Sequence, residues 1–197
     1  MKLLLIIIFL LNMLTQNNNT QYAYLGGGCF WCIEAVFQNL KGVESVVSGY
    51  SGGESSTANY KDVSTGKTKH VEVCKIAYNP KIISYDILLA VFFYSHDPTQ
   101  LNRQGNDIGP QYQSAIFYLN NEEKNQCKKY IEDLEFQKIY ENIKTNLIKF
   151  ENFYKAEEYH QNYFQLNSNQ PYCSIIINPK VEKLKKKFKN YYPKKIN

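Results

Sequence analysis

The stretch Gly26–Cys32, with the sequence GGGCFWC, constrains the fold of this chain more than any other. Its three glycines allow a sharp turn and a close approach of the backbone to a bound group. Apolar residues then recur at helical spacing from Ile33 to Leu40, so a helix is predicted to begin near Cys29. The preceding residues, Tyr22–Leu25, have the composition of a short strand. The stretch therefore predicts a strand, a tight turn and a helix with a cysteine at its start.

The position of this cysteine suggests reactivity. A helix N-terminus carries the positive end of the macrodipole and unpaired N–H groups, and both favour the nucleophilic thiolate. Cys29 is thus a candidate nucleophile, and the alternative is a buried free thiol with Phe30 and Trp31 as core residues. A thioredoxin-type dithiol of Cys29 and Cys32 is a further alternative, because strand, turn, CxxC and helix are its local layout. The triglycine and the downstream order of elements argue against it.

The other cysteines do not indicate a metal site or a disulfide scaffold. Five cysteines in 197 residues are too few for a disulfide-dense fold. Zinc would need a second ligand pair beside the CxxC, and Cys74, Cys127 and Cys173 are isolated from one another. We read Cys74 and Cys127 as structural. The length allows one domain of ordinary size.

Positive charge is concentrated at the C-terminus. The net charge is +5, but eight lysines and one glutamate lie in residues 180–197, so the rest of the chain carries −2. We therefore expect a main domain over residues 21–179 and a basic tail over 180–197. The tail is read as the solvated face of a terminal helix, and binding to a polyanion or an anionic surface is the alternative.

Residues 1–20 resemble a targeting segment. The apolar run Leu3–Leu11 is too short to span a bilayer and sits where a signal-peptide core belongs. No clear small-x-small cleavage site follows, so a retained N-terminal anchor is the alternative. The segment predicts export, and with it an oxidising compartment.

Along the chain, strands and helices alternate irregularly, which predicts an α+β fold with two layers and a mixed sheet. The predicted strands are Tyr22–Leu25, Val43–Gly49, Lys69–Tyr78, Gln113–Leu119 and Ile143–Phe150. The predicted helices run from near Cys29, from Ser84 to Tyr94, from Asn120 or Asn121 to Leu134, from Ala156 to Leu166 and from Val181 to Phe188. The segment Asn169–Ile177 is expected to be irregular.

Candidate chemistry lies in three further places. Strand alternation puts His70 and Glu72 on one face, where Glu72 could donate a proton if burial raised its pKa; the alternative is a solvent-facing glutamate on an edge strand. Tyr60 follows a polar loop, and Asp107 and Tyr112 lie at the end of a long one. These side chains could hold a polar substrate.

Cys173 lies late in the chain, in the segment expected to be irregular. A mobile cysteine there could reach a reactive one and form a disulfide. The alternative is a simple buried thiol.

Several motifs in the right order resemble peptide methionine sulfoxide reductase, type A. The resemblance covers about Tyr22 to Phe188 and is specific because it rests on many motifs. They are Gly27–Cys32, Gly49–Gly53, His70–Glu72, Asp97–Gln100, Arg103–Asp107, Gln111–Tyr112, Glu158–Gln161 and Pro171–Cys173.

The resemblance implies a ferredoxin-like core and a set of roles. Cys29 matches the nucleophile that attacks the sulfoxide sulfur, and Glu72 the acid that protonates its oxygen. Tyr60 and Tyr112 match phenols that bind that oxygen. The remaining substrate contacts match Phe30, Trp31, Asp107 and His70.

The resemblance also implies the rest of the cycle. The S epimer of methionine sulfoxide, free or in proteins, is reduced, leaving a sulfenic acid on Cys29 that a second cysteine converts to a disulfide. Cys173 matches that resolving residue by position, while Cys32 is nearer but poorly placed unless the first helical turn unwinds. Thioredoxin or an equivalent dithiol restores the thiols. No metal, organic cofactor or nucleic acid is expected, and the protein is expected to be a monomer.

Two other functions compete with this one. A general thiol–disulfide oxidoreductase would use Cys29 with Cys32 and would not need Glu72. A surface-binding protein would depend on the basic tail, and its binding would weaken with salt.

Overall fold

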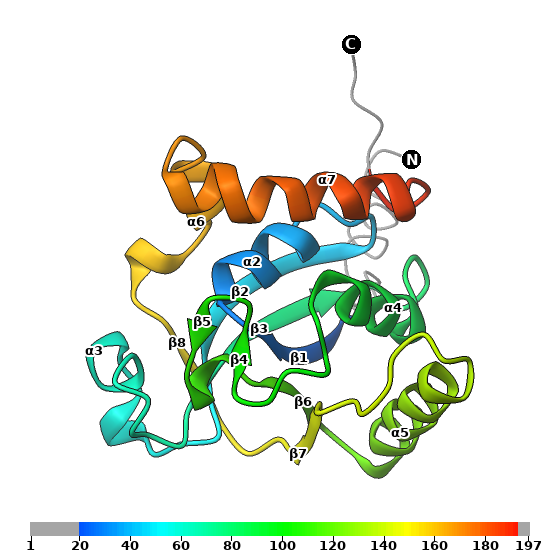
Figure 1. Ribbon diagram of the computed structural model, residues 1–197, viewed down its shortest axis with the longest axis horizontal. Helices are drawn as coiled ribbons and strands as arrows, with labels where there is room; N and C mark the ends of the chain where they lie inside the picture. Colours follow the sequence, from blue (N-terminus) through cyan, green and yellow to red (C-terminus); the bar gives the residue numbers. More distant parts are fainter. Residues whose placement is uncertain (1–19, 193–197) are drawn as a thin grey trace, which may run out of the picture.

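The computed structural model describes residues 20–192, which form one six-stranded sheet with helices packed on it (Figure 1). The strand order is β7-β6-β1-β3-β2-β8. Neighbouring strands are antiparallel except β6 and β7, which are parallel. The strands are β1 (Gln21–Gly27), β2 (Val43–Ser51), β3 (Val71–Tyr78), β6 (Ser114–Tyr118), β7 (Asn146–Lys149) and β8 (Phe153–Lys155).

The centre of the molecule has a ferredoxin-like arrangement. The chain runs β1, α2 (Phe30–Phe37), β2, β3, α4 (Tyr85–Ser95) and β6, and the corresponding sheet order is β6-β1-β3-β2. Strand β3 therefore lies between β1 and β2, as a split β-α-β unit requires. This confirms the predicted α+β fold with a mixed sheet and a ferredoxin-like core.

The main core lies between this sheet and the helices. Buried residues of α2, α4 and α7 (Asn178–Lys187) belong to one cluster with Leu25, Cys74 and Ile76 from the sheet. The opposite face of β3 presents Val71 and Val73 to a smaller cluster. The alternation predicted for this strand is therefore correct, and both of its faces are buried.

Shorter elements complete the fold. They are α3 (Tyr60–Val63), α5 (Asn121–Phe136), α6 (Tyr163–Leu166) and the small hairpin β4 (Arg103–Gln104) and β5 (Asp107–Ile108). Two predicted helix starts are confirmed by their caps: the side chains of Ser84 and Asn120 accept backbone N–H bonds from Ile87 and Glu123.

Two predicted segments are wrong. Residues 156–166 do not form one helix, because Asn162 adopts a left-handed conformation (φ 52°) between a 3₁₀ turn, Glu158–His160, and α6. Residues 169–177 are not irregular: a π-helical turn, Cys173–Ile177, runs directly into α7. Cys173 and Ile177 are both buried, so the core holds this turn in place.

The structure differs from the expected boundary at residue 180. Helix α7 crosses this position and lies across α2 (Figure 1). Val181 and Leu184 are buried in the main core, while the last turn of α7 carries three lysines. This part of the basic segment is thus one face of a packed helix.

The predicted targeting segment lies almost wholly outside the described residues. Within residues 20–192, no helix has the length and apolarity needed to cross a membrane.

Candidate functional site

Cys29 is the N-cap residue of α2, directly after the glycine turn. Gly28 has φ +89°, and a Cβ there would lie 2.6 Å from the side chain of Gln104, so only glycine fits. Cys29 itself is 9% exposed. Burial raises the pKa of its thiol well above the usual value, assisted by a side-chain hydrogen bond with Cys32. The thiolate expected from the helix N-terminus is thus opposed by burial, and the resting side chain is a neutral thiol.

Glu72 lies on the central strand β3 and is 2% exposed. Its Oε2 accepts the backbone N–H of Phe30 at 3.0 Å. Burial raises the pKa of Glu72 to about 8, although the hydrogen bond from Phe30 acts in the opposite direction. The alternative of a solvent-facing glutamate on an edge strand is therefore wrong, and the carboxyl group is mostly protonated at neutral pH.

A cavity of about 150 Å³ joins these two residues; we call it the substrate cavity. It is lined by Cys29, Phe30, Trp31, Tyr60, Glu72, Asp107, Tyr112 and Tyr172. Thus all the predicted site residues come together here except His70 and Cys173. Four parts of the chain, residues 29–31, 60–72, 107–112 and 172, meet at this cavity.

Two phenols complete the polar wall. Burial raises the pKa of both Tyr60 and Tyr112, so each hydroxyl stays protonated and able to donate. Tyr60 is held by its backbone, whose N–H donates to Glu157 at 2.8 Å. Glu157 also accepts the Tyr50 hydroxyl at 3.0 Å. This carboxylate therefore positions Tyr60 from outside the cavity.

Trp31 forms the aromatic wall and is fixed on two sides. Its ring stacks on Tyr163 with centroids 3.6 Å apart and an interplanar angle of 4°. Its Nε1–H donates to Nδ1 of His160 at 3.1 Å. The two partners lie on either side of Asn162, and Glu34 of α2 holds this turn because its side chain accepts the N–H groups of Asn162 and Tyr163.

Tyr172 is a site residue that the sequence did not single out. Its hydroxyl donates to Asp107 at 2.7 Å and lies 3.8 Å from the Cys32 sulfur. Its ring meets Trp31 edge-on. As one of 17 tyrosines it carries no distinguishing mark except its place before Cys173.

His70 and Cys173 lie away from the substrate cavity. The Nε2 of His70 is 3.0 Å from the carbonyl oxygen of Glu54, and the ring meets Tyr50 and Tyr154 edge-on. Cys173 is 0% exposed within its π-helical turn.

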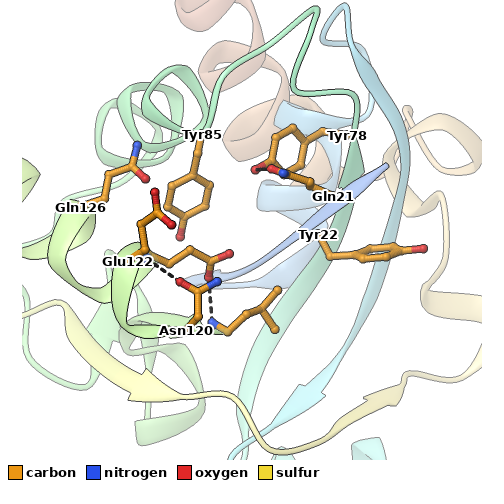
Figure 2. Close-up of a pocket in the computed structure, with 9 residues that line it drawn as sticks. Gln21, Tyr22, Tyr78, Tyr85, Asn120, Glu122 and Gln126 are labelled. Atoms are coloured by element: carbon orange, nitrogen blue, oxygen red, sulfur yellow. Dashed lines mark hydrogen bonds between the residues drawn. The ribbon is translucent and has the colours of Figure 1, made fainter. Parts of the chain in front are cut away.

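A second pocket shows that tyrosines and carboxylates alone do not make such a site. This pocket, of about 340 Å³, lies between the start of β1 and the start of α5 (Figure 2). It contains Tyr78, Tyr85 and Glu122, but no cysteine lines it. Its Glu123 accepts the Leu119 N–H at 2.7 Å, which serves the helix start. Within residues 20–192, no cluster of three histidine, cysteine or acidic side chains could hold a metal ion.

Comparison with known proteins gives one consistent answer. The family model described as "Peptide methionine sulfoxide reductase" matches residues 21–192. A curated "Peptide methionine sulfoxide reductase MsrA" from Nautilia profundicola is 53% identical over 161 residues, which cover 82% of this chain and 92% of the relative.

Solved structures agree. Reduced Mxr1 from Saccharomyces cerevisiae aligns with a TM-score of 0.73 and 34% identity, covering 78% of this chain and 89% of that one. Mxr1 in complex with Trx2 aligns with a TM-score of 0.53 and 25% identity, covering 73% and 84%.

Proposed function

The chain belongs to the peptide methionine sulfoxide reductase family, and we propose that it reduces methionine sulfoxide with Cys29 as nucleophile and Glu72 as proton donor. The observation that carries these roles is the pairing of a thiol with a neutral, buried carboxyl group in one aromatic cavity. Sulfoxide sulfur is a poor electrophile until its oxygen is protonated, so the reaction needs an acid that keeps its proton at neutral pH.

In the first step, the Glu72 carboxyl group protonates the sulfoxide oxygen while the Cys29 sulfur attacks the sulfoxide sulfur. The oxygen leaves methionine and ends on Cys29 as sulfenic acid, and the thiol proton restores Glu72. Cys29–SH and the sulfoxide thus become Cys29–SOH and the thioether, with atoms and electrons balanced. The hydroxyl groups of Tyr60 and Tyr112 are suited to hold the oxygen as it takes up the proton, since burial keeps both protonated.

The cavity walls support selection of one epimer. Phe30 and Trp31 offer an apolar surface for the substrate methyl group in the same cavity as the polar side chains. Asp107 contributes a carboxylate at the rim, held by Tyr172. If the methyl group lies on the aromatic wall, the oxygen points toward Glu72 and the sulfur faces Cys29, three directions at the sulfur are fixed and only one epimer can be accommodated. The S epimer, which the family resemblance implies, is the proposed substrate. His70 does not line the substrate cavity, so we propose no role for it in substrate binding.

The cycle closes by thiol exchange. A second cysteine condenses with the sulfenic acid and releases water, and thioredoxin or an equivalent dithiol then reduces the disulfide. The Mxr1 complex with Trx2 supports thioredoxin as the class of reductant. Cys173 is one candidate for the resolving cysteine and Cys32 is the other.

The test is turnover of S and R sulfoxides with dithiothreitol. We expect only the S epimer to be reduced, and we expect Cys29→Ser to be inactive and Glu72→Gln severely impaired. Cys127→Ser is the matched control, because Cys127 is a buried thiol that forms a hydrogen bond with Tyr85 and does not line the substrate cavity. Reduction of insulin disulfides without reduction of either sulfoxide would instead indicate a general dithiol oxidoreductase.

Export through the N-terminal apolar run is a separate proposal. The run Leu3–Leu11 supports it, and a fusion of residues 1–20 to a reporter active only outside the cytoplasm tests it. An inactive reporter would contradict it.

A further inference from the structure

Helix α7 concentrates positive charge on the surface of the molecule (Figure 1). Its sequence contains five lysines and a single acidic residue, Glu182, whose carboxylate pairs with Lys185 at 2.9 Å. Three other lysines of the helix are exposed, and we call them the α7 lysine face: Lys183, Lys186 and Lys187. The chain outside residues 180–197 carries a net charge of −2, so this positive surface belongs to an otherwise slightly negative protein.

The α7 lysine face surrounds a hollow that suits an anionic group. This hollow, of about 620 Å³, is lined by the three lysines of the face together with Tyr94, Pro179 and Glu182. The ammonium groups of Lys183 and Lys187 lie 4.6 Å and 5.6 Å from the centre of the same Tyr94 ring. Like charges four residues apart on a helix repel each other, and a phosphate group bound between them would offset that repulsion.

The described chain begins and ends beside the same connection, between α2 and the start of β2. At its beginning, the Thr20 hydroxyl donates to the Glu44 carboxylate at 2.8 Å. Near its end, the Tyr191 carbonyl accepts the backbone N–H of Lys41 at 2.7 Å. The segment that precedes Thr20 and the segment that follows α7 are therefore attached at one edge of the molecule.

The same edge exposes an apolar side chain next to further lysines. The backbone N–H of Asn79 donates to the Gly42 carbonyl at 2.7 Å, so the turn before α4 packs against this connection. In that turn Ile82 is 58% exposed, and a Cβ on Gly42 would lie 2.9 Å from it. Its neighbour Lys81 is exposed, as is Lys41. An exposed isoleucine bordered by lysines suits a bilayer surface, where anionic headgroups cover an apolar interior.

From these observations we propose that the protein binds an anionic lipid bilayer through the α7 lysine face, with the apolar run Leu3–Leu11 retained and inserted beside it. One short apolar anchor holds a protein on a bilayer only weakly, whereas an anchor combined with a polybasic surface gives stable attachment. Residues 12–19 join the run to Thr20, and a chain of that length reaches at most about 30 Å. The run can therefore enter the bilayer that the lysines contact. The inference goes beyond the proposed reaction and does not depend on it.

A bilayer accounts for more of these features than a nucleic acid does. The lysines would attract either polyanion, but a nucleic acid would leave the exposed Ile82 and the apolar run without a partner. The three lysines of the face line neither the substrate cavity nor the neighbouring cavity of about 450 Å³ that Cys29 and Cys32 share. Membrane binding and turnover of a soluble sulfoxide can therefore be measured separately.

Sedimentation of the full chain with vesicles tests the proposal. Vesicles of equal parts phosphatidylglycerol and phosphatidylcholine are compared with vesicles of phosphatidylcholine alone. We expect binding to the anionic vesicles to be at least about tenfold tighter, and to weaken as NaCl rises from about 50 to about 500 mM, because salt screens the lysines. Equal binding to both kinds of vesicle, or binding to neither, would overturn the proposal. Binding to single-stranded RNA without binding to vesicles would also overturn it and would indicate a nucleic-acid partner.

Two triple variants with the same change in charge locate the contact. The first removes the α7 lysine face and is Lys183→Gln/Lys186→Gln/Lys187→Gln. The second, the matched control on α5, is Lys124→Gln/Lys128→Gln/Lys129→Gln. Each set contains a lysine that stacks on a tyrosine ring, Lys183 on Tyr94 and Lys124 on Tyr118.

The α7 variant should bind the anionic vesicles about 100-fold more weakly, because each lysine near such a surface contributes roughly a factor of five. The α5 variant should bind as the wild type does. Equal losses in the two variants would overturn the assignment of the contact to α7. Both variants should turn over a soluble S sulfoxide at the wild-type rate, which shows that they are folded and separates this test from that of the proposed function.

The apolar run is tested by Leu5→Asp in the full chain, with Asn17→Asp as the control that adds the same charge outside the run. Burial of one leucine side chain contributes about a factor of ten or more, so Leu5→Asp should weaken binding to the anionic vesicles by at least that factor. The binding that remains should still weaken with salt, because the lysine face is intact. Equal binding by the two variants would contradict insertion of the run.

Discussion

Two carboxyl groups are buried near helix α2, and they differ in what surrounds them. Glu72 is 2% exposed and accepts one backbone N–H, from Phe30. Glu34 is 0% exposed and accepts two, from Asn162 at 2.9 Å and Tyr163 at 3.0 Å. Burial raises the pKa of both groups, and in Glu34 it is opposed by both backbone bonds. Only Glu72 lines the substrate cavity.

This difference separates two uses of the same side chain. A buried carboxyl group with a single N–H partner and an open cavity beside it retains a proton that a substrate can receive. A carboxyl group that spans two N–H donors and borders no substrate joins segments of the fold instead. Glu34 holds the turn that carries His160 and Tyr163, and these in turn fix Trp31.

Replacing the proton donor should have the largest effect. Glu72→Gln keeps the shape and a hydrogen bond to Phe30 but removes the acidic proton, so kcat/KM should fall by about 10²–10⁴-fold. Steady-state turnover of the S sulfoxide checks this, with Glu34→Gln as the matched control. An equal loss of kcat/KM in the two variants would contradict the different roles assigned to the two carboxyl groups.

The pH profile sharpens the same contrast. Since the pKa of Glu72 is about 8, kcat/KM of the wild type should decline as pH rises through that value, because the acid loses its proton. The residual activity of Glu72→Gln should not show this decline near pH 8. A wild-type profile that stays flat up to pH 9 would contradict a protonated Glu72.

The same shift predicts a pH effect on stability. The folded-state pKa of Glu72 is raised from 4.5 to about 8, so its contribution to stability is complete below pH 4.5 and is lost as pH rises through about 8. For a nearly fully buried group the loss is about 3–5 kcal/mol in the free energy of unfolding. Urea unfolding at pH 6 and pH 9 should show a smaller loss in Glu72→Gln than in the wild type. An equal loss in both would assign the pH dependence to other groups.

Glu34→Gln should affect stability more than rate. An amide has one acceptor oxygen for the two N–H groups and places its NH₂ against a donor, which costs about 1–3 kcal/mol of unfolding free energy. Urea unfolding at pH 7 measures this. We expect kcat/KM to fall by less than in Glu72→Gln, because the variant only loosens the turn that carries His160 and Tyr163, the two residues that hold Trp31. A larger rate loss with unchanged stability would give Glu34 a chemical role.

Replacing Glu157 should have the smallest effect of these substitutions. Burial acts to raise its pKa, but hydrogen bonds from the Tyr60 N–H and the Tyr50 hydroxyl lower it overall. In Glu157→Gln the side-chain oxygen still accepts one of these hydrogen bonds, so the variant should lose the free energy of one hydrogen bond, about 0.5–1.5 kcal/mol. Because Tyr60 is then less well held, we expect KM to rise a few-fold. A fall in kcat with unchanged KM would count against this positioning role.

The sequence predicts the local part of this site well. The glycine turn and the helical spacing after it are local patterns, and the structure confirms Cys29 at the start of α2. Strand alternation is also local, and it correctly puts Glu72 opposite Val71 and Val73.

The parts that the sequence missed depend on distant contacts. The chain turns at Asn162 because Glu34, 128 residues earlier, takes its N–H, and no local pattern announces such a bond. Cys173 lies in a helical turn because α7 packs on α2, whereas its own sequence is rich in turn-forming residues just upstream. The proximity of Cys32 and Lys180 arises in the same way.

The most direct test of the account is the protonation state of Glu72 in the free protein. A ¹³C NMR titration of glutamate carboxyl groups, compared between the wild type and Glu72→Gln, identifies the resonance of this side chain. We predict a midpoint near pH 8, which would mean that a proton is available for the sulfoxide oxygen at neutral pH. A Glu72 midpoint below about pH 5, the range of ordinary glutamates, would contradict its role as the proton donor.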